Sequence, residues 1–138
     1  MHEQAISFIR SKKAESVGIL GLSYKPDEKS EEYSPVMKII EGLAKEGISV
    51  RVNDPNYTAE EIETHTGAAA FSFPEGLEDF DLILLFTGHT DYRAVSWERL
   101  SACCKAKWIL DNTDSWSSFP WESLGATCNV VGGADWRG

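Results

Sequence analysis

The sequence lacks the cysteine spacing of a metal or redox centre. Its three cysteines are Cys103, Cys104 and Cys128, and no two of them form the C-x-x-C pair that zinc sites and thiol–disulfide centres use. Long apolar runs are absent as well, because none approaches the roughly 20 residues of a membrane span. Residues 1–13 mix charged and apolar side chains, unlike a signal peptide. We therefore expect reduced thiols, no bound metal, no contact with membranes and a cytoplasmic location.

Positive charge is also scarce. The chain has 13 lysines and arginines against 22 aspartates and glutamates, a formal net charge of −9. Nucleic-acid phosphates repel such a chain, so we expect no nucleic-acid partner. Hydrophobic residues nevertheless make up 42% of the 138 residues, which indicates a packed core. No repeat or linker divides the chain, and we expect one domain over residues 1–138.

Short β-type runs alternate with helical patterns along the whole chain. The clearest run, residues 82–86, is continuously apolar, as in a strand that is covered on both faces. Alternation of this kind predicts an α/β fold: a Rossmann-like three-layer sandwich with a mostly parallel, doubly wound sheet of five or six strands. The expected strands are residues 16–20, 48–53, 68–71, 82–86, 108–110 and 129–131.

Capping residues mark several helices. Ser34 can cap a helix that has Pro35 at its first position. Thr58 and Glu61 have the spacing of a capping box, and Gly67 is placed to end that helix. Two further helices are expected over residues 3–12 and 96–103.

The turn after the first strand carries the most informative pattern. Residues from Gly21 to Pro35 follow, without a gap, the form G-L-(A/S)-(F/Y)-K-x-x-T-x-D-x-R-x-S-P, except at a few positions. Later matches are a strand ending in Asp-Pro at residues 54–55, the stretch 81–92 with its threonine, histidine and tyrosine, and the strand ending at Asp111. Over residues 14–112 the chain resembles the C-terminal, UDP-binding domain of the UDP-glucose/GDP-mannose dehydrogenase family.

The resemblance implies a role in a larger enzyme. Members of that family oxidise the primary alcohol of a nucleotide sugar to a carboxylate in two NAD-dependent steps, and their C-terminal domain holds the nucleotide diphosphate of the substrate. The substrate-binding residues that it implies here are Tyr24, Lys25, Ser34 and His89. The N-terminal and central parts of the family, or another subunit, are the implied partners.

Other parts of the family pattern are missing. No G-x-G-x-x-G loop follows a strand, since Gly18 and Gly21 are too close together, and no cysteine lies in a catalytic context. We therefore expect no cofactor in this chain and no activity from it alone. Glu32 and Thr113 also stand where the family has arginines, and an arginine fork forms strong paired bonds with phosphate.

Two functions follow from these matches and departures. The first is a nucleotide-sugar binding domain of an NAD-dependent dehydrogenase, noncatalytic in isolation. The alternative is a stand-alone Rossmann-like interaction or regulatory module that has lost nucleotide-sugar binding.

Several residues keep two interpretations at this point. Lys25 contacts a diphosphate or is a solvated loop lysine, and Ser34 helps to bind an anion or only caps a helix. His89 edges a ligand cleft or orders its loop. The acidic residues 27–32 form a solvated loop or a cation site. Trp116 and Trp121 cover a pocket or interface, or pack locally.

Overall fold

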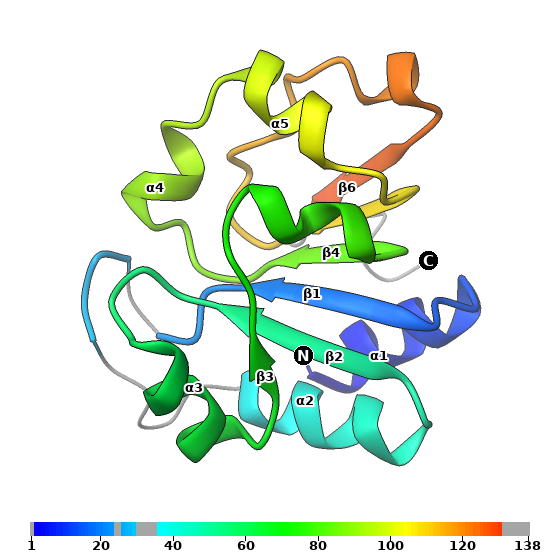
Figure 1. Ribbon diagram of the computed structural model, residues 1–138. Helices are drawn as coiled ribbons and strands as arrows, with labels where there is room; N and C mark the ends of the chain where they lie inside the picture. Colours follow the sequence, from blue (N-terminus) through cyan, green and yellow to red (C-terminus); the bar gives the residue numbers. More distant parts are fainter. Residues whose placement is uncertain (1, 24–25, 30–35, 131–138) are drawn as a thin grey trace.

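The computed structural model describes residues 2–23, 26–29 and 36–130 (Figure 1). Its strands are β1 (Ser16–Leu20), β2 (Ser49–Asn53), β3 (Ala69–Ala70), β4 (Leu82–Leu85), β5 (Trp108–Asp111) and β6 (Thr127–Val130). All neighbouring strands are parallel, and their order across the sheet is β3-β2-β1-β4-β5-β6. The chain thus winds outward from β1 in one direction and from β4 in the other, which confirms the doubly wound α/β fold.

Strand β4 shows why the protein has three layers. Its four residues are all buried, and successive side chains point to opposite faces of the sheet. Leu82 and Leu84 belong to one hydrophobic core, whereas Ile83 and Leu85 belong to a second core on the other face. A strand with both faces covered needs apolar residues at every position.

The first core lies beneath three helices, α1 (His2–Ser11), α2 (Val36–Lys45) and α3 (Ala59–Thr66). The second core lies beneath shorter elements, which are the 3-10 helices η1 (Glu75–Asp79) and η2 (Trp121–Leu124) and the helices α4 (Thr90–Arg93) and α5 (Trp97–Cys103). Figure 1 shows α1 and α2 on one side of the sheet and α4 and α5 on the other.

Tryptophan side chains fill much of the second core. Trp116 and Trp121 are both buried, with 0% and 2% of their surface exposed. The Trp116 indole N–H donates to the Tyr92 carbonyl and the Trp121 indole N–H to the Trp116 carbonyl, each at 2.8 Å. Trp97 packs edge-on against Trp121. Trp116 and Trp121 therefore pack locally, which decides between the two interpretations that the sequence left open for them.

Most predicted elements are present with small shifts at their ends. Strand β1 and the Thr58 capping box occur as expected, and Gly67 ends α3 in a left-handed conformation. The last strand was placed wrongly, since β6 begins at Thr127, opposite Trp108 of β5, and not at residue 129. Helices α4, η1 and η2 had no counterpart in the prediction. No helix in the described part of the chain is long and apolar enough to cross a bilayer.

Candidate functional site

The doubly wound order makes a topological switch point at the carboxyl ends of β1 and β4, on the left in Figure 1. The two strands are neighbours, but their connections leave to opposite sides of the sheet, and α/β proteins bind ligands at such a point. We call three segments here the switch-point loops: residues 21–29 after β1, as far as they are described, 54–57 after β2 and 86–89 after β4. The site is built from them.

Gly21 begins the first loop in a backbone conformation that requires glycine. Its φ is +103°, and a Cβ atom at this position would lie 2.5 Å from the Cβ atom of Thr87. This close approach lets the Thr87 hydroxyl donate a hydrogen bond to the Ser23 carbonyl. The loops after β1 and β4 are thereby in direct contact.

Asp54 joins all three loops through one buried carboxylate, which is only 2% exposed. Its Oδ2 accepts hydrogen bonds from the backbone N–H groups of Leu22 at 2.7 Å and Ser23 at 3.2 Å, and lies 2.9 Å from Nε2 of His89. Its Oδ1 accepts from the Asn56 N–H at 2.8 Å. Burial alone raises the pKa of Asp54, but the bonds from His89, Leu22 and Asn56 outweigh it and lower the pKa below 3.8.

His89 is fully buried and bonded at both ring nitrogens. Its Nδ1 accepts a hydrogen bond from the Asp27 backbone N–H at 2.7 Å, so the proton of the neutral ring lies on Nε2 and is donated to Asp54. Neither nitrogen is left to take a proton from a substrate. In this arrangement His89 orders the loops.

Asp27 fixes the far side of the first loop. Its carboxylate accepts from the Thr90 backbone N–H at 2.8 Å and from the Thr90 hydroxyl at 2.7 Å, and lies 3.7 Å from the Arg93 guanidinium. The hydrogen bonds from Thr90, followed by the charge of Arg93, lower the pKa of this exposed carboxyl. Asp27 serves as an acceptor at the start of α4, and the described residues contain no cluster of His, Cys, Asp or Glu suited to a metal ion.

Asp111 organises the loop after β5 in a similar way. Its Oδ1 accepts from the Thr113 N–H and hydroxyl, each at 2.8 Å. Its Oδ2 accepts from the N–H groups of Ser115 at 2.9 Å and Trp116 at 2.8 Å. The Thr113 hydroxyl also lies 2.6 Å from that of Ser115. Thr113, one of the expected arginine positions, is thus bonded within its own loop.

The predicted site residues are only partly within the described structure. His89 lies buried in the loop after β4, whereas Tyr24, Lys25 and Ser34 fall outside the described residues, as does Glu32. The sequence analysis did not predict that Asp54, Asp27 and Asp111 accept the hydrogen bonds that hold these loops together. A usable signal existed for Asp54 and Asp111, because an acidic residue that ends or directly follows a buried parallel strand lies at the ligand-binding edge of the sheet.

Comparisons with known proteins agree with this architecture. Residues 18–117 match the family model described as UDP-glucose/GDP-mannose dehydrogenase family, UDP binding domain. A putative UDP-glucose 6-dehydrogenase of Bacillus subtilis is 24% identical over 127 residues, which are 91% of this chain and 29% of the relative. A UDP-N-acetyl-D-mannosamine dehydrogenase of Pyrococcus horikoshii is 28% identical over 95 residues, which are 69% of this chain and 21% of that relative.

Solved structures show the same fold. An NDP-N-acetyl-D-galactosaminuronic acid dehydrogenase from Methanosarcina mazei superimposes with a TM-score of 0.73 at 17% identity, over 99% of this chain and 29% of that one. A UDP-glucose dehydrogenase from Pyrobaculum islandicum superimposes with a TM-score of 0.68 at 18% identity, over 94% of this chain and 28% of that one. The chain therefore spans less than a third of these proteins. On the match over residues 18–117, it belongs to the UDP-glucose/GDP-mannose dehydrogenase family and corresponds to its UDP binding domain.

Proposed function

We propose that this domain binds the nucleotide diphosphate of a UDP- or GDP-sugar at the switch-point loops, as one part of an NAD-dependent nucleotide-sugar dehydrogenase. The observation that carries the proposal is the hydrogen-bond network of Asp54, His89 and Asp27 in a chain that belongs to this family. A preorganised site loses less conformational freedom when a ligand binds.

The network supports a role for residues that lie next to it in the sequence. Leu22 and Ser23 donate to Asp54, and Asp27 donates to His89. Tyr24 and Lys25 stand between these anchored positions, and Lys25 occupies the place of the family's phosphate-facing lysine. In the proposed complex Lys25 supplies the positive charge for the diphosphate, and Tyr24 and Ser34 complete the binding edge. His89, which is buried, supports that edge by holding the loops in place.

We place the NAD site and the catalytic cysteine in other domains or another subunit. A dinucleotide pyrophosphate needs a glycine-rich turn that leads into a helix. Here Gly18 lies inside β1, and a Cβ atom there would come within 2.6 Å of the Phe80 ring. Gly21 alone cannot form that turn, so the described residues do not fit the cofactor. The isolated domain is thus expected to bind and not to oxidise.

A second candidate is a stand-alone interaction or regulatory module. The observation that favours it is the charge at the two arginine positions of the family. Glu32 places a negative charge there, and the Thr113 hydroxyl is already bonded to Asp111 and Ser115. Loss of an arginine fork removes charge-assisted bonds of about 1.5–3 kcal/mol each.

A titration separates the two functions. The purified chain is titrated with UDP, GDP, UDP-glucose and NAD while tryptophan fluorescence and melting temperature are followed. The proposal predicts saturable binding of one of the uracil or guanine nucleotides and none of NAD. Lys25→Ala should weaken that binding about tenfold or more, whereas Lys38→Ala, an equal charge loss on the exposed side of α2, should not.

Restoring the family charge gives an independent check. Glu32→Arg should tighten UDP binding, because it replaces a repulsive charge with a phosphate-binding fork. If the natural chain and Glu32→Arg both ignore every nucleotide at about 1 mM, the binding proposal is wrong and the interaction module replaces it.

A further inference from the structure

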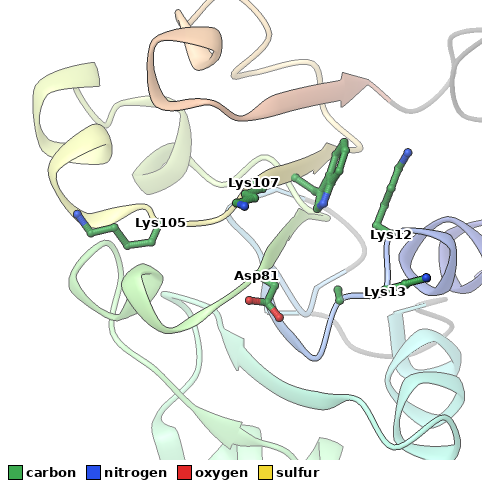
Figure 2. Close-up of a pocket in the computed structure, with 7 residues that line it drawn as sticks. Lys12, Lys13, Asp81, Lys105 and Lys107 are labelled. Carbon is green, nitrogen blue, oxygen red and sulfur yellow. The ribbon is translucent and has the colours of Figure 1, made fainter.

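A pocket of about 230 Å³ lies at the opposite, amino edge of the sheet. Four lysines line it together with Asp81 and Trp108 (Figure 2). Lys12 and Lys13 follow α1, Asp81 precedes β4, and Lys105 and Lys107 precede β5. Figure 2 shows Lys12 and Lys13 on one side of Asp81 and Lys105 on the other. Segments distant in the sequence thus bring four lysines to one edge of an acidic chain.

Within residues 2–23, 26–29 and 36–130, these lysines have no carboxylate partners. No carboxylate oxygen of the described residues lies within 4.0 Å of any of the four ammonium groups. Every arginine of the described residues is paired with a carboxylate, as Arg10 is with Glu46 at 2.6 Å and Arg51 with Asp79 at 3.6 Å. The lysine pocket therefore combines a net positive lining with a concave shape, and both attract a small anion.

The fold holds the walls of the pocket in place. The Lys12 ammonium lies 4.5 Å from the centre of the Trp108 ring and 5.1 Å from that of Phe8, so two aromatic faces position it. Asp81 Oδ2 accepts a hydrogen bond from the Glu15 N–H at 2.9 Å, and the Asp81 carbonyl accepts from the Lys107 N–H at 3.1 Å. Asp81 thus ties together the segments that carry the lysines.

We propose that the lysine pocket binds a small molecule that carries two or more phosphate groups, at a site separate from the switch-point loops. Every cation among the described lining residues is a lysine, and ammonium groups act as point charges that suit the many oxygens of a polyphosphate. The pocket is smaller than the 300–1,000 Å³ or so of a typical site for drug-sized ligands, which favours a compact anion. Asp81 also lines the pocket, and its negative charge opposes binding.

Inorganic pyrophosphate is the probe for this proposal. The ¹⁵N-labelled 138-residue chain is titrated with it, and amide shifts are followed at low and high salt. The expected result is saturable shifts at Ala14 and Lys107, with an affinity that falls as salt rises. Shifts confined to residues 21–23 and 87–89 would place the anion at the carboxyl edge and overturn the proposal, as would the absence of saturation at about 1 mM.

Matched variants test the site itself. The double variant Lys105→Gln/Lys107→Gln should weaken pyrophosphate binding about tenfold. The control Lys38→Gln/Lys45→Gln removes the same charge from exposed positions of α2 and should leave the affinity unchanged. Asp81→Asn keeps an acceptor for the Glu15 N–H but removes the opposing charge, so it should tighten binding. Equal losses in the two double variants, or weaker binding in Asp81→Asn, would overturn the proposal.

Discussion

At the scale of single residues, Asp54 connects the three switch-point loops through one carboxylate. Its carboxylate receives bonds from Leu22, Ser23, Asn56 and His89 while it is almost completely buried. A buried charge is tolerated only where hydrogen bonds replace its water. These hydrogen bonds therefore offset the cost of burying the Asp54 carboxylate and also hold the three switch-point loops together.

Replacing Asp54 gives a prediction about stability and pH. Asp54→Asn should cost about 2–4 kcal/mol of unfolding free energy near pH 7, because its NH₂ group would face N–H donors. The folded-state pKa of Asp54 lies below 3.8, so the unfolded chain takes up the proton more readily. This contribution is complete above about pH 5, begins to fall near the unfolded pKa and is lost as the pH falls through the folded pKa.

Urea unfolding at several values between about pH 7 and pH 3 measures this effect. The loss of stability in acid should be shallower in Asp54→Asn than in the natural protein. Asp91→Asn is the control, since it makes the same chemical change at an exposed position of α4. Identical pH profiles for the natural protein and Asp54→Asn would contradict the prediction.

At the scale of elements, α3 shows how local sequence alone can define a helix. The Thr58 hydroxyl accepts from the Glu61 N–H at 3.1 Å, and the Glu61 carboxylate accepts from the Thr58 N–H at 2.9 Å. Glu61 also pairs with Lys29 of the first switch-point loop. The start of α3 is therefore fixed by its own residues and by a contact with the binding edge.

We expect Thr58→Ala to lower the unfolding free energy by about 1 kcal/mol, because the Glu61 N–H loses its acceptor. Thr58→Ser keeps a hydroxyl and should retain most of the stability. Thermal unfolding of both variants, followed by circular dichroism, makes the comparison. A Thr58→Ala protein as stable as Thr58→Ser would show that the cap contributes nothing.

The sequence was sufficient for elements with long patterns and clear ends. Capping residues predicted α2 and α3, the helix expected over residues 96–103 is α5, and the apolar run predicted β4. Helix α4 and the two 3-10 helices are about one turn long, so they contain no full period of apolar residues. Strand β6 was misplaced because pairing with Trp108 and Ile109 of β5 sets where it begins, and a single sequence does not contain that information.

Some features of the candidate site could likewise be predicted from the sequence, and others could not. The family pattern pointed to the carboxyl edge and to His89, since both depend on residues close together in the chain. The partners of His89 could not be predicted, because Asp54 and Asp27 come from the ends of other strands. Which nitrogen carries its proton likewise depends on loops that meet only in the folded protein.

At the scale of the whole molecule, the parallel sheet pairs strands that lie far apart in the sequence. The bonds of Asp54 to Leu22 and His89 join positions 32 and 35 residues apart, and the bond between Asp27 and His89 joins positions 62 apart. Closing such long loops costs entropy before any contact can compensate for it. The network is complete only when β1, β2 and β4 already lie side by side.

This separation determines how Asp54 affects the kinetics of folding. If its bonds form after the rate-limiting step, Asp54→Asn should leave the folding rate nearly unchanged and should raise the unfolding rate, by about 30-fold for a loss of 2 kcal/mol. Stopped-flow refolding and unfolding in urea measure both rates, and a fall in the folding rate by the same factor would show early formation instead. If the folding rate is unchanged and only the unfolding rate rises, Asp54 determines how long the domain stays folded and not how quickly it folds.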